Sequence, residues 1–188
     1  MGIRFLPSAA ILTLSLTSMA GLTPATAQTA AQHTALASDS NFIQQTMSLG
    51  LLQVKLAKLA QQKGSSEVVR DFGKQVLTDY TKLNEQLASA AKAAAYPHPV
   101  LLREHQQIFD RFNTMGRGSF DKNYMAEMVS RHDETAGLFQ AEAKSGKVQS
   151  LKQLAAALLP DVQRYQSLAA QAAGSVGADV TASASSER

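Results

Sequence analysis

The sequence predicts an all-α protein in which four long helices form a bundle, with a long crossover and a short extra helix between the second and third helices. Three observations lead to this fold class. Four long segments repeat apolar residues every three or four positions, which is the period of an amphipathic helix. No segment alternates apolar and polar residues as a strand does, and glycine or proline clusters separate the segments.

The N-terminus, residues 1–27, has the features of a secretory signal peptide. Arg4 precedes an apolar stretch from Phe5 to Leu16, and Ala25-Thr26-Ala27 fits a cleavage site before Gln28. The apolar stretch is too short to span a bilayer stably, and no later segment is long and apolar enough to do so. We therefore expect a periplasmic or secreted protein, cleaved near Ala27-Gln28, with no transmembrane helix in its mature form.

The first helix is expected to follow a flexible linker at residues 28–37, which are small and polar. The bundle then spans residues 38–173, and the cluster Ser38-Asp39-Ser40 offers N-cap oxygens for its first helix. Gly64 is expected to end this helix. The apolar stripe consists of Phe42, Leu49, Leu52, Leu56 and Leu59.

The second helix is predicted from an N-cap in Ser65-Ser66 to about Ala95. Its stripe includes Val69, Phe72, Val76, Tyr80, Leu83 and Leu87. Pro97 and Pro99 follow, and proline cannot continue a helix. The crossover then holds a short helix, from about Leu101 to Asn113, and the run from Met115 to Gly118 breaks it.

The third helix is predicted from near Ser119 to Ser145-Gly146, and the fourth starts near Val148. We expect Pro160 to kink or divide the fourth helix. The tail, residues 174–188, is small and polar, and we expect it to be disordered. Because the segment from about 96 to 118 is long enough to run the length of the molecule, the predicted bundle is of the ferritin-like kind.

The composition argues against nucleic-acid binding and against common catalytic machinery. The chain has 18 Lys and Arg against 15 Asp and Glu, and the two signs are interleaved. It has no cysteine, no Gly-x-Ser-x-Gly motif and no glycine-rich phosphate loop. We therefore expect a non-enzymatic protein without a nucleic-acid partner. Lys55, Lys58 and Lys63 form either a solvated helix face or a weak contact with anionic lipid or cell-wall surfaces.

Metal binding is the main chemical alternative, because helical bundles often hold metals in their cores. The di-iron pattern requires Glu-x-x-His motifs, and the four main helices contain none. His132 is the one histidine on a main helix. With the thioethers of Met125 and Met128 it would suit copper, although methionines at helical spacing are more often core filler. We expect no cofactor, with copper or iron as the metals to test.

The stripes of the second and fourth helices carry Tyr80 and Tyr165 where an apolar residue would be expected. Tyrosines at such positions usually pack their rings and send their hydroxyls to a partner. A buried histidine likewise needs a hydrogen bond, and either tyrosine could supply it to His132. We therefore predict a structural polar cluster in the core, made of Tyr80, His132 and Tyr165.

Several segments along the chain share residues with a known family: Phe42, Gly50 to Ala60, Ser66 to Val68, Glu104 to Gln106, Gly118 to Met125, Met128 to His132, and Leu158 to Pro160. In these segments the chain resembles the DUF4142 family of bacterial exported proteins. The resemblance covers about residues 38–172, and its most specific piece is Phe-Asp-x-x-Tyr-Met followed by Met-Val-x-x-His. It implies a ferritin-like fold, while the biochemical function of the family is not established.

The resemblance also implies which polar core residues differ in this chain. Family members typically carry histidine at the positions of Tyr80 and Tyr165, glutamate at Gln53 and aspartate at Arg131. His132 alone remains of the three histidines. Three functions stay open: a non-enzymatic envelope-stress or interaction protein, a metal-binding bundle centred on His132, and a surface-associating protein that uses the first-helix lysines.

Overall fold

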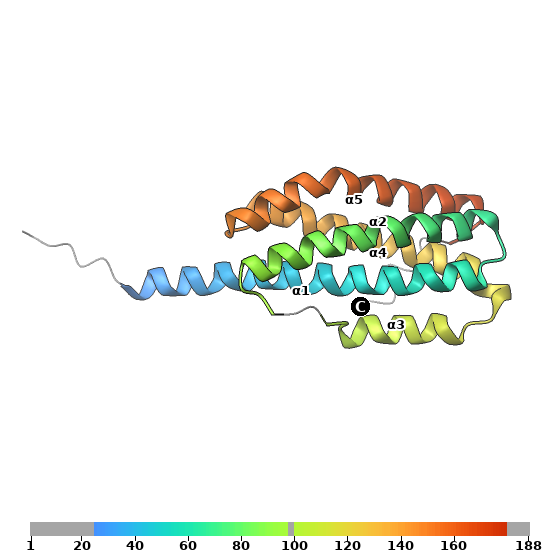
Figure 1. The fold of residues 1–188 in the computed structure, drawn as a ribbon, viewed down its shortest axis with the longest axis horizontal. Coiled ribbons are helices and arrows are strands. Elements are labelled where there is room, and N and C mark those ends of the chain that lie inside the picture. The colour runs from blue at the N-terminus through green and yellow to red at the C-terminus, as the bar shows by residue number, and fades with distance from the viewer. Residues whose placement is uncertain (1–24, 98–99, 180–188) are drawn as a thin grey trace, which may run out of the picture.

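The computed structural model describes residues 25–97 and 100–179, with side chains from residue 37 onward. This part of the chain contains helices and no strand, so the predicted all-α class is confirmed (Figure 1). The five helices are α1 (Ala25–Lys63), α2 (Glu67–Ala93), α3 (Arg103–Thr114), α4 (Arg117–Ser145) and α5 (Gln149–Ser175). None of the described helices is long and apolar enough to cross a membrane.

The four long helices lie side by side (Figure 1). α1 packs against α2 and α4, and α5 packs against the same two helices on the other side. Short connections join α1 to α2 and α4 to α5, so each pair is an antiparallel hairpin. The connection from α2 to α4, residues 94–116, returns along the length of the molecule, and α3 within it lies against α1.

Two aspartates join the hairpins, one at each end of the molecule. At the end that we call the Gly64 end, Asp121 of α4 accepts N–H bonds from Ser65 (3.0 Å) and Ser66 (2.7 Å) in the α1–α2 connection. At the opposite Gly146 end, Asp39 of α1 accepts N–H bonds from Lys147 (3.1 Å) and Val148 (2.5 Å), where α5 begins. Each short connection is therefore held by a carboxylate from the other hairpin.

These contacts correct two predicted caps. Ser66 occupies the N-cap position of α2, but its side chain forms no capping hydrogen bond. Asp39 does not start α1, because the helix already begins at Ala25. The stretch 28–37, predicted as a flexible linker, is part of α1 instead. Its alanines have the highest helix propensity of any residue, and it contains no glycine or proline to stop the helix. Residues 1–24 of the predicted signal peptide lie outside the described residues.

The C-terminal part limits one prediction and corrects another. Of the two effects expected of Pro160, a kink or a division, the division does not occur, since α5 runs through Pro160 as one helix. Pro160 and Ala156, whose carbonyl loses its helical N–H donor, both face solvent, where water replaces that donor. The predicted disordered tail starts too early, since α5 extends to Ser175 and both Val176 and Ala178 pack against the core. Residues 180–188 lie outside the described residues.

The crossover is fastened to α1 and α4 by polar contacts. Ser48 of α1 hydrogen-bonds Nδ1 of His105 in α3 (2.5 Å) and accepts the N–H of Leu102 (2.8 Å). Arg111 of α3 forms an ion pair with Glu127 of α4 (2.5 Å). Ser48 and His105 are both buried, so α3 is an integral part of the fold rather than a loose loop.

Apolar side chains fill the bundle in two clusters. Leu56, Phe72, Phe120 and Tyr124 belong to the cluster toward the Gly64 end, and Phe42, Leu87, Phe139 and Leu151 belong to the cluster toward the Gly146 end.

Candidate functional site

The structure brings together the three residues that the sequence marked on separate helices. Tyr80 of α2, His132 of α4 and Tyr165 of α5 form what we call the aromatic cluster. The Tyr80 ring meets the His132 ring edge-on, with centroids 5.4 Å apart, and meets the Tyr165 ring in the same way at 5.3 Å. The His132 and Tyr165 rings stack at 5.9 Å. All three side chains are buried.

His132 is held as a neutral imidazole in this cluster. Its Nδ1–H donates to the carbonyl of Met128 (2.7 Å), which fixes the tautomer. Burial lowers the pKa of His132 to about 4, because the charged form loses its hydration. Its Nε2 has no hydrogen-bond partner among the described residues. The expected hydrogen bond to Tyr80 or Tyr165 is therefore not formed, and His132 meets both tyrosines through ring contacts.

Of the two tyrosines, Tyr80 has the more deeply buried hydroxyl. Its hydroxyl is buried and has no hydrogen-bond partner in the described part of the chain. Burial, and then the nearby Tyr165, raise its pKa far above the ordinary value of 10.0. The amide of Gln53 on α1 lies beside this hydroxyl and donates instead to Thr135 of α4 (3.2 Å). Tyr80 is therefore a neutral ring at any physiological pH.

Tyr165 lies closer to the surface and is tied to charged neighbours. Its hydroxyl donates a short hydrogen bond to the carboxylate of Asp79 on α2. Arg164 lies over the Tyr165 ring, 4.6 Å from the centroid, and its guanidinium reaches Asp79 at 3.4 Å. Burial and the Asp79 carboxylate raise the pKa of Tyr165 above its ordinary range. The result is a polar network that joins α2 to α5 next to the aromatic cluster.

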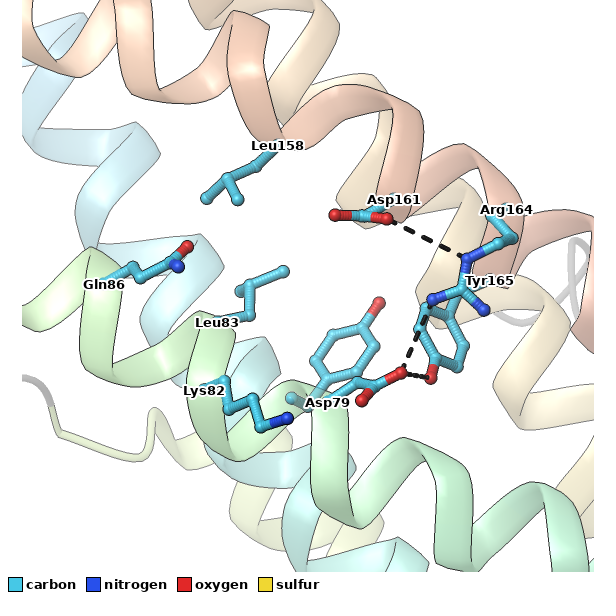
Figure 2. A pocket seen from close by; sticks show the side chains of 9 residues that line it. Asp79, Lys82, Leu83, Gln86, Leu158, Asp161, Arg164 and Tyr165 are labelled. Atoms are coloured by element: carbon cyan, nitrogen blue, oxygen red, sulfur yellow. Dashed lines mark hydrogen bonds and ion pairs between the residues drawn. The ribbon is translucent and has the colours of Figure 1, made fainter.

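A cavity of about 270 Å³ opens between α2 and α5 beside this network (Figure 2). Tyr80 and Tyr165 contribute to its wall, whereas His132 lies behind them and does not line it. The remaining wall residues are Asp79, Lys82, Leu83, Gln86, Leu158, Asp161 and Arg164. The cavity, rather than the buried imidazole, is the part of the site that a dissolved molecule can reach.

Sequence reasoning singled out the two tyrosines but missed the charged residues around them. A weak signal was present, because Asp79 immediately precedes Tyr80 and Arg164 immediately precedes Tyr165. A charged residue next to a stripe position points to the edge of the buried face on a helix. Only the packing of α2 on α5 shows that the two edges meet.

The residues proposed for copper lie in the apolar core. Met125 and Met128 are fully buried in the cluster toward the Gly64 end, and Met128 offers its backbone carbonyl to His132. No group of three or more His, Asp or Glu side chains that could hold a metal ion occurs among the described residues.

The lysines of the predicted basic face are largely occupied within the protein. Lys55 lies over the Phe109 ring of α3, with its Nζ 4.3 Å from the centroid. Lys63 donates hydrogen bonds to carbonyls at the end of α3, including those of Phe112 (3.1 Å) and Met115 (3.0 Å). Of the three lysines, Lys58 remains exposed. Lys55 and Lys63 therefore anchor the crossover.

Comparison with known proteins identifies the family. No curated protein and no solved structure matches the chain. Residues 23–172 match a family described as a domain of unknown function, DUF4142. This match covers the helices α1 to α4, α5 as far as Ala172, and every residue of the candidate site. The chain therefore belongs to the DUF4142 family.

Proposed function

We propose that this chain is an exported, periplasmic protein of ferritin-like fold that binds a small molecule without catalysing a reaction. The observation that carries the proposal is the cavity of about 270 Å³ between α2 and α5, walled in part by two fixed tyrosine rings. Small-molecule sites are usually concave, with apolar and aromatic walls and a few placed polar groups. This cavity is concave and has two aromatic and two aliphatic residues in its wall, together with five polar or charged residues.

The export and the fold rest on different observations. The N-terminal charge, apolar stretch and Ala25-Thr26-Ala27 site support secretion to the periplasm. The ferritin-like topology is supported by the two antiparallel hairpins and by the crossover from α2 to α4 along the length of the bundle.

A non-catalytic role fits the protonation states of the cluster. General acid–base catalysis works best with a pKa near the operating pH. Burial moves the pKa values of Tyr80 and Tyr165 upward and that of His132 downward, away from neutrality in each case. The rings therefore act as a rigid, uncharged wall.

The proposal is tested by screening small molecules with amide NMR on the mature protein. Replacement of Leu158 by Trp fills the cavity, and replacement of the exposed Val68 by Trp is the matched control at the Gly64 end. We expect at least one compound to shift amide signals from α2 and α5 in the wild type and in Val68→Trp, but not in Leu158→Trp. A screen in which no compound shifts these signals contradicts the proposal.

A metal-binding role centred on His132 is the second candidate. It is favoured by Nε2 of His132, which has no hydrogen-bond partner in the described part of the chain and could coordinate an ion. Elemental analysis of protein purified from the periplasm tests it. A content of less than about a tenth of an equivalent of copper, iron or zinc would exclude it, since a real site binds tightly. A stoichiometric metal that His132→Leu removes would support it.

A further inference from the structure

The chain carries few side chains that give up an electron readily. It has no cysteine and no tryptophan, so its four tyrosines are the main one-electron donors. Methionine reacts with oxidants chiefly by taking up oxygen, which is a two-electron step. All four tyrosines lie among the described residues: Tyr80, Tyr96, Tyr124 and Tyr165. The site of one-electron oxidation is therefore decided among these four.

The hydroxyl of Tyr165 differs from the other three in having a proton acceptor. A tyrosine that loses an electron at neutral pH also has to lose its phenolic proton. The hydroxyls of the other three tyrosines are buried and have no hydrogen-bond partner in the described part of the chain. The hydroxyl of Tyr165 donates to the carboxylate of Asp79, and the carbonyl of Gln75 lies 3.4 Å away. A carboxylate takes up a proton far more readily than an amide carbonyl does.

Arg164 makes this proton transfer necessary as well as available. Its guanidinium lies over the Tyr165 ring, 4.6 Å from the centroid. A cation in this position is attracted to the neutral ring, and it repels a ring that has lost an electron but kept its proton. The electron therefore leaves together with the proton. Arg164 also contacts Asp79 at 3.4 Å, which orients the carboxylate beside the ring.

The Tyr165 ring is reached from solution through the α2–α5 cavity. Figure 2 shows Tyr165, Asp79 and Arg164 together at one side of this cavity. Tyr80 lines the same cavity, but its hydroxyl has no acceptor among the described residues. The two tyrosines thus share access to a small oxidant and differ in where their protons can go.

Ring contacts connect Tyr165 with the inner tyrosines. The Tyr165 ring lies 5.3 Å from Tyr80 and 5.9 Å from His132, centroid to centroid. From His132 the contacts continue to Phe72 at 5.9 Å and from Phe72 to Tyr124 at 6.3 Å. An electron vacancy on an inner tyrosine can pass along these contacts to Tyr165, where the proton can leave.

We propose that Tyr165 is a redox-active tyrosine, which gives one electron to a small oxidising radical in the α2–α5 cavity while its phenolic proton passes to Asp79. The O–H bond of Tyr165 breaks, and a new O–H bond forms on the Asp79 carboxylate. With nitrogen dioxide as the oxidant, the products are nitrite and a neutral tyrosyl radical. This chemistry suits a scavenger of oxidising radicals. It goes beyond the proposed binding function and does not depend on it.

The first experiment maps the nitration of the mature protein by nitrogen dioxide, which is generated from nitrite by pulse radiolysis. A further nitrogen dioxide molecule adds to a tyrosyl radical, so nitrotyrosine in digested peptides marks where the electron was lost. We expect most of the label on Tyr165. Exposure alone predicts Tyr96 instead, because Tyr96 is half-buried and the other three tyrosines are buried. Label that is greatest on Tyr96, or equal on Tyr165 and Tyr80, overturns the proposal.

The second experiment removes the proton acceptor. Asp79→Asn keeps the shape of the side chain and an acceptor oxygen, but its amide does not take up the proton. A positioned proton acceptor typically contributes about a hundredfold or more, and water replaces part of this, so we expect nitration of Tyr165 to fall by about tenfold. Asp71→Asn, exposed on α2 outside the cavity, is the matched control and should leave nitration unchanged. Undiminished nitration of Tyr165 in Asp79→Asn contradicts the role of Asp79.

The third experiment separates proton transfer from a structural role of Asp79. Time-resolved absorption after the radiolysis pulse follows the tyrosyl radical in ordinary and in heavy water. The radical should form more slowly in heavy water, because the proton moves in the same step as the electron. Tyr165→Phe should lose most of the radical signal, and Tyr80→Phe should keep it. A rate that is equal in the two solvents, or a signal that Tyr165→Phe retains, refutes the proposal.

Discussion

The aromatic cluster in the middle of the bundle and the carboxylates at its Gly146 end are both buried, yet burial makes them respond to pH in opposite directions. Desolvation is the largest cause in both places, and it disfavours the charged form. For His132 the neutral form is the deprotonated one, so its pKa falls to about 4. For Glu142 the neutral form is the protonated one, so its pKa rises to about 7.

The two regions also differ in how their polar atoms are satisfied. In the aromatic cluster, ring contacts surround His132, and its one hydrogen bond goes to a neighbouring turn of its own helix. At the Gly146 end, Asp39 takes backbone N–H donors from the start of α5, and its negative charge raises the pKa of Glu142 further. Lys152 partly offsets this effect. In the middle of the bundle, the buried polar residue is neutral and needs no charged partner. At the Gly146 end, the junction between α1 and α5 depends on the charged carboxylate of Asp39.

The largest effect is therefore expected at Asp39. Asp39→Ala should lower the free energy of unfolding by about 3 kcal/mol, because it leaves the N–H groups of Lys147 and Val148 without their acceptor. Urea unfolding at pH 7 measures the change. Asp121→Ala is the matched variant at the Gly64 end and should cost about 1 kcal/mol, since Asp121 is half-buried whereas Asp39 is fully buried, and water can replace the Asp121 carboxylate more easily. Equal costs at the two ends would contradict this ranking.

His132 should give the protein an acid-sensitive middle. Its pKa is about 4 in the folded protein against an ordinary value of 6.5, so the folded state binds fewer protons between these values. The contribution of His132 to the free energy of unfolding is therefore fully present above pH 6.5. It falls by about 3 kcal/mol as the pH drops to 4. His132→Leu should reduce that loss, and His105, which stays in the variant, accounts for part of what remains. If urea unfolding shows the same loss of stability between pH 6.5 and 4 in His132→Leu as in the wild type, His132 is not its cause.

Glu142, at the Gly146 end, should make the protein lose stability as the pH rises, which is the opposite pH dependence. Its pKa is about 7 in the folded protein against 4.5 ordinarily, so the folded state binds more protons in this window. The contribution of Glu142 to the free energy of unfolding is fully present below pH 4.5. It falls as the pH rises through 7, by about 1–2 kcal/mol after allowance for solvent screening. Glu142→Gln should be more stable than the wild type at pH 8 and equal to it at pH 4. A variant that is less stable at pH 8 would show that the carboxylate is needed there.

The smallest effect concerns the two tyrosine hydroxyls. Tyr80→Phe removes a buried hydroxyl without a described partner, so we expect a change between zero and a gain of about 1 kcal/mol. Tyr165→Phe removes the hydrogen bond to Asp79 and should cost about 1 kcal/mol. Thermal unfolding of the pair at pH 7 compares them directly. A greater loss in Tyr80→Phe than in Tyr165→Phe would mean that the deeper hydroxyl carries the more important contact.

The sequence by itself determined the all-α class and the residues that face inward. Apolar period and helix breakers placed Tyr80, His132 and Tyr165 on buried stripes, and the structure buries all three. Boundaries were less well predicted, because a polar, alanine-rich stretch such as 28–37 has helix propensity without an apolar stripe to mark it.

Only the tertiary structure decided which helix each apolar stripe packs against and in which axial register. Asp39 reaches Val148 across 109 residues, and Tyr165 reaches Asp79 across 86. The period of a helix tells which side is buried, but it carries no information on the rotation or axial register of the helix packed against it. The cavity between α2 and α5, and the carboxylates that join the hairpins, follow from that register.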